Sequence, residues 1–206
     1  MADTSAVPAL TKDGKTTRIL VEVLAERLET LNIPEAHVMG NGATSEQNLQ
    51  AAFAGESQAN RKYLAFARQA EQEGQLQVAK LFRAAAEAET VHALNHLRAL
   101  GAIKSTSDNL LEAIAGETHE FTHMYPEMIV TAREEGAAQA LRSFQFAYEV
   151  EKVHAGLYLE ALECLEKSHE EFDYYVCPVC GHTIERRAPE TCEICGAKGS
   201  VFLHVG

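Results

Sequence analysis

A seven-residue segment that occurs twice constrains the fold of this chain more than any other feature. Its copies are Glu87–Ala93 and Glu149–Ala155, and each contains the pattern Glu-x-x-His. On a helix, positions i and i+3 lie on one face, so a carboxylate and an imidazole can converge on a single ion. The repetition therefore predicts two helices that each carry part of a metal site. The donors of the two patterns are Glu89, His92, Glu151 and His154.

The repeat extends upstream, and its spacing changes along the way. Residues 48–56 resemble residues 109–117 at an offset of 61, whereas the downstream pairs are offset by 62. The second half has therefore gained one residue between Glu117 and Tyr125. An extra residue within a helix is usually absorbed as a π-bulge, often at a functional site. We expect such a bulge here and expect it to turn Glu120, which has no charged counterpart in the first half, inward.

Composition bounds the class of protein. The chain has 206 residues, enough for one full-sized domain and one small one, and 46% of them are hydrophobic. A net charge of −12 disfavours nucleic acid and anionic membranes as partners. No run of 18 apolar residues and no signal pattern is present, so a cytoplasmic protein is expected.

Helix signals divide the chain into three parts. Residues 1–44 are expected to be an extension with one short helix at Thr17–Leu31. Residues 45–168 are expected to form four helices, and residues 172–206 a small metal-binding domain. The four helices are expected from Thr44 or Ser45 to Gly74, from Gln75 to about Leu100, from a cap at Ser107 to about Gly136, and from about Ala137 to Lys167.

Short connections set the expected topology. The turns at Gly74 and Gly136 are so short that each must join an antiparallel helix pair. Pro126 lies inside the third helix and is expected to kink it, because it lacks a backbone donor. The predicted fold is mainly α: an antiparallel, ferritin-like four-helix bundle of two hairpins joined by the link at 101–107, followed by the small C-terminal domain.

The carboxylates complete a recognisable set of metal ligands. One Glu from each of two helices plus Glu-x-x-His from each of the other two is the ligand set of a carboxylate-bridged di-metal site. Neighbouring residues are small or apolar, so these glutamates are expected on a buried stripe, where metal coordination offsets the cost of burial. His96, His119 and His123 are expected to be exposed or outside the ligand set, and Cys164 to be buried. In chain order the candidate ligands are Glu56, Glu89, His92, Glu117, Glu120, Glu151 and His154.

The C-terminal segment carries a separate signal. Its cysteines have the spacing C-x2-C-x11-C-x2-C, which indicates a four-thiolate metal site. Such a site holds tetrahedral zinc or a single iron, and the spacing does not separate them. So short a segment lacks a sufficient core, so the metal must contribute to its stability. The ligands are Cys177, Cys180, Cys192 and Cys195.

Together these motifs resemble the rubrerythrin family over about residues 45–206. The resemblance rests on the two Glu-x-x-His motifs, the four cysteines and the segments 54–59, 115–117, 124–126 and 132–136. It implies a ferritin-like di-iron bundle with a rubredoxin-like tail. The extension before residue 44 departs from the usual pattern of the family, in which the first bundle helix begins almost at once.

The resemblance also implies a chemistry. The family's activity would be that of a peroxidase that reduces hydrogen peroxide to water at two Fe ions, in oxidative-stress defence. Glu89 and Glu151 would bridge the metals, with Glu56 on the first ion. Glu117 and His154 would bind the second, and His92 and Glu120 would compete for the first. Tyr63 and Tyr125 would act as hydrogen-bond donors to the carboxylates.

The partners follow from the same resemblance. One Fe (or Zn) in the four-cysteine site would pass electrons from an external reductase or rubredoxin, which makes the activity indirectly NAD(P)H-dependent. The tail would lie near the di-iron site of a partner subunit in a head-to-tail homodimer or a larger assembly. Two other functions stay open: a ferritin-like protein that oxidises and stores iron, and a non-catalytic metal-binding module with zinc in the four-cysteine site.

Overall fold

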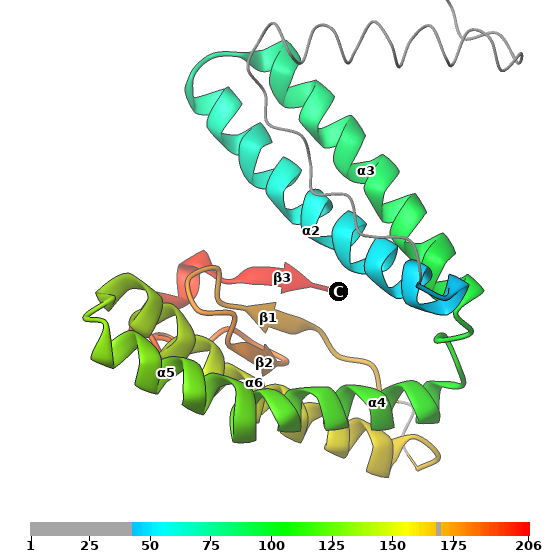
Figure 1. Ribbon diagram of the computed structural model, residues 1–206. Coiled ribbons are helices and arrows are strands. Elements are labelled where there is room, and N and C mark those ends of the chain that lie inside the picture. The colour runs from blue at the N-terminus through cyan, green and yellow to red at the C-terminus, as the bar shows by residue number, and fades with distance from the viewer. Residues whose placement is uncertain (1–42, 168–169) are drawn as a thin grey trace, which may run out of the picture. The chain divides into compact units, whose positions relative to one another are not determined.

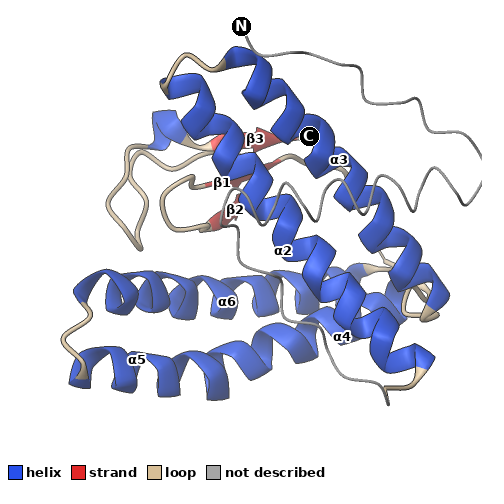
Figure 2. Cartoon of the chain, turned by 45° about the horizontal axis from the view of Figure 1, so that its top comes forward, coloured by secondary structure: helices blue, strands red, loops and turns tan. Residues whose placement is uncertain are grey.

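A computed structural model describes residues 43–167 and 170–206, so the helix expected at Thr17–Leu31 lies outside the described residues. The mainly α fold predicted from the sequence is confirmed, as helices that form two hairpins precede a small C-terminal sheet (Figures 1 and 2). None of the described helices is long and apolar enough to cross a membrane. The helical elements are α2 (Ser45–Gln72), α3 (Leu76–Ala99), α4 (Thr106–His119), the π-helical segment η1 (Glu120–Met124), α5 (Tyr125–Glu134) and α6 (Ala138–Cys164).

The first hairpin pairs α2 with α3. Thr44 and Gln47 form the expected capping box, with the Thr44 amide donating to Gln47 Oε1 at 2.9 Å and the Gln47 amide donating to Thr44 Oγ1 at 3.2 Å. Gly74 reverses the chain with a φ of 77°, a conformation that glycine adopts without steric cost. The buried apolar residues of this pair are all alanines, which allow the helix backbones to approach closely. They are Ala67, Ala70, Ala79, Ala86 and Ala93.

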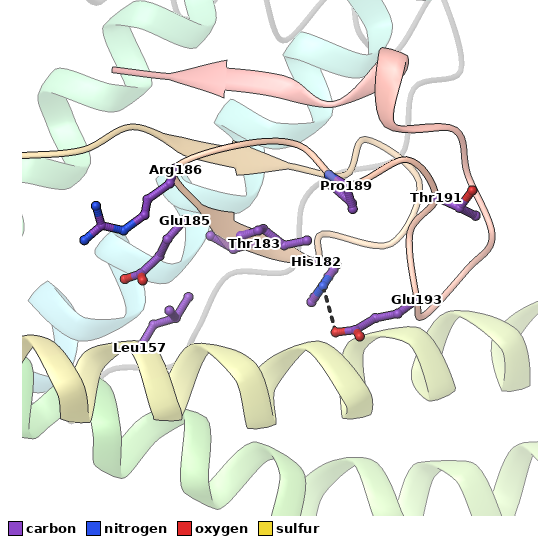
Figure 3. A pocket seen from close by; sticks show the side chains of 9 residues that line it. Leu157, His182, Thr183, Glu185, Arg186, Pro189, Thr191 and Glu193 are labelled. Atoms are coloured by element: carbon purple, nitrogen blue, oxygen red, sulfur yellow. Dashed lines mark ion pairs between the residues drawn. The ribbon is translucent and has the colours of Figure 1, made fainter.

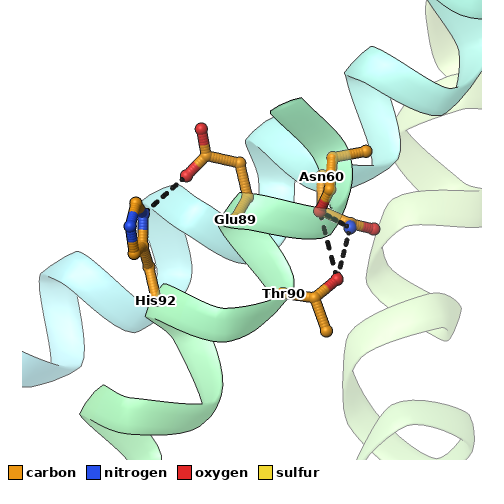
Figure 4. Close-up of polar contacts among 5 residues, drawn as sticks. Asn60, Glu89, Thr90 and His92 are labelled. Carbon is orange, nitrogen blue, oxygen red and sulfur yellow. Dashed lines mark hydrogen bonds and ion pairs between the residues drawn. The ribbon is translucent and has the colours of Figure 1, made fainter. Parts of the chain in front are cut away.

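One buried polar side chain ties the two helices of this hairpin together. Asn60 of α2 donates from Nδ2 to the Ala86 carbonyl at 2.7 Å and to Thr90 Oγ1 at 2.9 Å, both on α3 (Figure 4). Asn60 is only 9% exposed. A buried amide must be satisfied by partners within the protein, so these bonds set the register of α3 against α2.

The second hairpin packs α4, η1 and α5 against α6. The chain reverses at Gly136, which has a φ of 67°. The cap of α4 is Ser105 rather than the expected Ser107: Ser105 is extended and accepts a hydrogen bond from the Asp108 amide at 3.1 Å. The helix begins earlier than predicted because Asn109 bonds back to the amide and the carbonyl of Lys104.

The predicted π-bulge is confirmed. Residues Glu120–Met124 form a π-helical turn, and the Tyr125 amide donates to the Glu120 carbonyl, five residues back. This turn comes directly before Pro126, which lies at the start of α5. The insertion inferred from the changed repeat offset is therefore absorbed within the helix, next to the residue that lacks a backbone donor.

The C-terminal segment forms a small antiparallel sheet in the order β2-β1-β3, with β1 in the middle (Figure 1). Its strands are β1 (Tyr174–Val176), β2 (Thr183–Glu185) and β3 (Leu203–Val205), with a short 3-10 helix η2 (Gly199–Val201) before β3. Cys164 at the end of α6 is exposed, contrary to expectation. The hydrophobic character of a thiol gave no information about which side of the helix end it would occupy.

Asn60→Ala should destabilise the first hairpin by about 1–3 kcal/mol, because it leaves a buried carbonyl and hydroxyl with fewer partners. Urea unfolding followed by helical circular dichroism measures this loss. The control is Gln69→Ala, which removes an exposed bond to Glu73 within the same helix and should change stability by less than about 0.5 kcal/mol. Equal effects of the two substitutions would contradict the role assigned to Asn60.

Candidate metal centres

The first group of candidate ligands lies on the α2–α3 hairpin. One donor atom each from Glu56, Glu89 and His92 lies within 4.8 Å of the others. His92 Nδ1 is 3.2 Å from Glu89 Oε2 (Figure 4). The Glu89 side chain is 17% exposed, whereas that of His92 is 54% exposed. The hairpin thus presents two carboxylates and one imidazole on one side.

The two carboxylates of this group shift each other's pKa in opposite directions. A hydrogen bond to Glu89, with burial and the charge of Glu89, raises the pKa of Glu56. The same bond lowers the pKa of Glu89. Two carboxylates in contact cannot both ionise without a compensating charge. A bound cation would supply that charge.

The second group lies on the α4–α6 hairpin and consists of Glu117, Glu151 and His154, whose donor atoms also lie within 4.8 Å of one another. His154 Nδ1 is 2.8 Å from Glu151 Oε2 and 3.8 Å from Glu117 Oε1. All three side chains are at most 25% exposed. This group is the more enclosed of the two.

Burial is the main cause of raised pKa values among the carboxyl groups of the second group and the nearby Glu120. Burial, followed by the charge of Glu151, raises the pKa of Glu117 to about 7. Burial also raises the pKa of Glu151. Burial and the charge of Glu117 raise the pKa of Glu120 as well. Three carboxyl groups therefore lie close together where ionisation is costly, an arrangement that cations stabilise.

The outer nitrogen of His154 has a defined partner in the C-terminal domain. His154 Nε2 is 3.0 Å from Thr183 Oγ1, and the Thr183 hydroxyl itself donates to the Gly181 carbonyl at 3.1 Å. A hydroxyl has one hydrogen to donate, so Nε2 must donate to Thr183. In the neutral imidazole the lone pair of His154 then lies on Nδ1, the nitrogen that faces the carboxylates and that a metal ion would bind. An outer hydrogen bond that fixes the tautomer in this way is typical of metal-binding histidines.

The four cysteines converge as their spacing predicts. Their Sγ atoms lie within 4.8 Å of one another, and two cross pairs are 3.5 and 3.6 Å apart. These separations are far longer than a disulfide bond of about 2.05 Å. They are close to the roughly 3.8 Å between ligands of a tetrahedral ion with 2.3 Å bonds to sulfur. The thiols are free, and their arrangement fits one tetrahedral iron or zinc ion.

Glycines and amides shape this four-cysteine site. Gly181 and Gly196, which follow the two cysteine pairs, have φ values of 87° and 76°. Each donates its amide to the carbonyl of the first cysteine of its pair at 2.9 Å. Burial raises the pKa of the Cys177 thiol, but hydrogen bonds from the Val179 and Cys180 amides outweigh it and lower the pKa overall. Such amides stabilise thiolate charge.

A pocket of about 430 Å³ separates part of this domain from α6 (Figure 3). His182 lines it, is 2% exposed and has Nε2 3.2 Å from Glu193 Oε1. Burial lowers the pKa of His182, opposed by the charge of Glu193. Sequence reasoning missed both His182 and Thr183, because neither belongs to a motif. Thr183 meets His154 only when the domain packs on α6, and His182 meets Glu193 only when the domain itself folds.

The structure brings ten of the eleven predicted ligands into three groups, and Glu120 lies outside them. It begins the π-helical turn and is partly buried near Glu117. Tyr125 lies close enough to Glu120, Glu151 and Glu117 for burial and their charges to raise its pKa. The Tyr63 ring lies 6.1 Å from Phe82. Among the described residues, no hydrogen bond joins either tyrosine hydroxyl to a candidate carboxylate.

Each hairpin supplies three donor residues, two carboxylates and an imidazole. These ligand types suit iron, manganese and zinc. The two groups together make the set of four carboxylates and two histidines that holds two metal ions in helical bundles. The fold and these groups define a class: a helical carboxylate metalloprotein with an attached four-thiolate domain.

Comparison with known proteins identifies the family. The rubrerythrin family model matches residues 47–162. Rubrerythrin-2 of Clostridium acetobutylicum is 37% identical over 171 residues, covering 75% of this chain and 92% of that protein. Nigerythrin of Nitratidesulfovibrio vulgaris is 38% identical over 168 residues, covering 75% and 82%. A solved mixed-valence nigerythrin structure is 32% identical, with a TM-score of 0.48 and coverage of 82% and 90%. The chain belongs to the rubrerythrin family.

Cys192→Ser should release the metal of the four-cysteine site and unfold residues 172–206, because that ion is their main source of stability. Metal analysis should show one ion fewer per chain, and helical circular dichroism should fall only slightly. The control is Cys164→Ser, which changes the exposed thiol at the end of α6 and should leave the metal content unchanged. Retention of the ion by Cys192→Ser would contradict the four-thiolate site.

Proposed function

We propose that the protein is a non-haem di-iron peroxidase that reduces hydrogen peroxide to water, with electrons delivered through an iron ion in its four-cysteine site. The observation that carries the proposal is the hydrogen bond between Thr183 of the four-cysteine domain and His154 of the carboxylate group. It supports direct communication between two metal centres within one chain. A protein that only stores iron, or a module that only binds zinc, has no use for such a connection.

Two ferrous ions held by the carboxylate groups would supply the two electrons that, with two protons, convert hydrogen peroxide into two molecules of water. The protein residues would hold this centre. Glu89 and Glu151 are proposed as the bridges, since each lies beside a histidine of the same helix. Glu56 and Glu117 are proposed to bind one ion each, as the resemblance to the family implies.

The two histidines differ in a way that suits different roles. His154 is held on both sides, by Glu151 at Nδ1 and by Thr183 at Nε2. His92 is 54% exposed, and Glu89 is its one hydrogen-bond partner among the described residues. This asymmetry supports His154 as a permanent ligand and His92 as a replaceable one. Glu120, displaced by the π-helical turn, is the proposed competitor of His92.

The electron route runs from sulfur to imidazole. Cys180 is followed in the chain by Gly181, whose carbonyl accepts a hydrogen bond from Thr183, and Thr183 accepts one from His154. Two hydrogen bonds and one short stretch of backbone therefore connect a thiolate ligand with a candidate ligand of the carboxylate site. An external reductase or rubredoxin would load the four-cysteine site with one electron at a time, which makes turnover indirectly NAD(P)H-dependent.

The function is tested by mixing the iron-loaded, anaerobically reduced protein with one equivalent of hydrogen peroxide. Wild type should bind about two irons beyond that of the four-cysteine site and be oxidised in a single rapid phase. Glu89→Ala should lose both of these irons, because a bridge serves two ions. Glu120→Ala should keep its ferrous iron, since His92 remains, but react about tenfold more slowly or worse, a loss of about 1.4 kcal/mol.

The comparison of these two variants discriminates between roles. Equal loss of iron in both would make Glu120 an ordinary ligand, and full reactivity in Glu120→Ala would remove it from the mechanism. A wild-type protein that binds iron in the helices but does not reduce peroxide would contradict the peroxidase assignment and favour iron storage.

Thr183→Val should slow the transfer of electrons from the four-cysteine site to the helices by about 10–100-fold, the range of activity loss that follows removal of the outer partner of a metal-binding histidine. Stopped-flow absorbance of the thiolate-bound iron during peroxide turnover measures this rate. Thr191→Val, the same change at an exposed position of the same domain, is the control. Unchanged transfer in Thr183→Val would exclude this route.

A further inference from the structure

Two histidines that the proposed function does not use lie next to each other on the second hairpin. His119 is the last residue of α4, and His123 lies in η1. Their rings are stacked, with centroids 5.4 Å apart and an interplanar angle of 14°. Positions i and i+4 of a helix lie on one face, so both imidazoles are presented on the same side of this segment.

This histidine pair is separate from the carboxylate group of the same hairpin. Residues two apart on a helix point about 200° away from each other, so His119 lies on the side of α4 opposite Glu117. Burial agrees with this placement, because both histidines are exposed, whereas Glu117 and Glu120 are partly buried. The pair therefore belongs to a different surface from the predicted ligands.

One ring of the pair has a fixed tautomer. The Thr122 hydroxyl donates to the Thr118 carbonyl at 2.5 Å, and His123 Nδ1 lies 2.6 Å from the same hydroxyl oxygen. A hydroxyl has one hydrogen to donate, so Nδ1 must donate to Thr122. In the neutral imidazole the lone pair of His123 then lies on Nε2. An outer hydrogen bond of this kind is typical of histidines that bind metal.

The ring of His119 can supply a second ligand. Among the residues that the structure describes, His119 has no hydrogen-bond partner, so either of its nitrogens is available. Two nitrogen ligands at about 2.0–2.1 Å from a tetrahedral ion are roughly 3.3 Å apart, which is less than the separation of the ring centroids. Because both side chains are exposed, a small rotation of each brings the nitrogens closer at low cost.

The sequence pattern of this segment is one that binds metal in other proteins. Residues 119–123 read His-Glu-x-x-His, which on a helix places two histidines on one face to hold zinc. Catalytic zinc has three protein ligands. Among the described residues, no further His, Cys, Asp or Glu completes such a group with this pair. The other positions of a bound ion would be open to water, so the pattern supports binding rather than zinc-dependent hydrolysis.

We propose that His119 and His123 form a site for one divalent transition-metal ion, and that this ion stabilises the π-helical turn. Neutral imidazoles suit Zn²⁺, Cu²⁺ and Ni²⁺, whereas Mg²⁺ and Ca²⁺ take oxygen ligands. The ion joins the residue before η1 to a residue near its end, and Glu120 lies between them. Bound in this way, it opposes straightening of the segment that carries Glu120.

Calorimetric titration of Zn²⁺ into the iron-loaded, oxygen-free protein tests the site. Wild type should bind one Zn²⁺ per chain more than the double variant with His119→Ala and His123→Ala. The control is His204→Ala, which changes an exposed histidine bonded to Asp173 in the C-terminal sheet and should bind Zn²⁺ as wild type does. Equal binding by wild type and the double variant overturns the proposal.

Thr122 provides a second test, which leaves both imidazoles in place. Thr122→Val should weaken Zn²⁺ binding by about 10–100-fold, the range of affinity loss that follows removal of the outer partner of a metal-binding histidine. Thr122→Ser keeps the hydroxyl and should retain the affinity of wild type. Equal affinities of Thr122→Val and Thr122→Ser would contradict coordination through Nε2 of His123.

Hydrogen exchange measures the effect of the ion on the turn. The Tyr125 amide donates to the Glu120 carbonyl within the π-helical turn. Zn²⁺ at roughly 100 times its Kd should slow exchange of this amide in wild type by up to about 100-fold, because the ion binds the closed turn, and should not slow it in the double variant. An unchanged rate in wild type with Zn²⁺ bound would overturn stabilisation of the turn. None of these measurements uses peroxide, so failure of this site and failure of the proposed function are distinguishable.

Discussion

Contact between carboxylates that are partly withdrawn from water is the constraint on which this structure depends. Glu56 with Glu89, and Glu117 with Glu151, lie so close that the charge of one carboxylate raises the pKa of the other. Helices that bury such groups are stable only if something neutralises them. The alanine seam and the Asn60 bonds hold one pair in place, and the packing of α4 on α6 holds the other. Bound metal ions would neutralise these groups, and the donor types present suit such ions.

One contact connects the C-terminal domain to the helices that carry the carboxylates. Its four cysteines, glycines and amides form a metal site that is complete in itself. The hydrogen bond from His154 to Thr183 links this domain to the carboxylate group on α4 and α6. The same bond orients the imidazole. The neighbouring His182 is buried at this contact, with Glu193 as its charged neighbour. Packing on α6, rather than the thiolate motif, joins the domain to the carboxylate chemistry.

Much of the local structure follows from the sequence, for identifiable reasons. The π-helical turn was predictable because a one-residue change in repeat offset must be absorbed within a helix. The ends of the hairpins follow from Gly74 and Gly136, which adopt a backbone conformation that other residues avoid. The predicted cap of α4, Ser107, lies two residues after the observed cap, Ser105. Both serines are equally good caps in isolation, and only the Asn109–Lys104 bonds select between them.

The sequence by itself determined the candidate ligands, because metal coordination requires particular donors at helical or cysteine-pair spacings, and such spacings are local. Tertiary structure decided which donors meet and what holds them. It placed Glu120 outside the two carboxylate groups, left His92 exposed and gave His154 a partner 29 residues further along the chain. These differences arise from the packing of distant segments, whose energies no local pattern records.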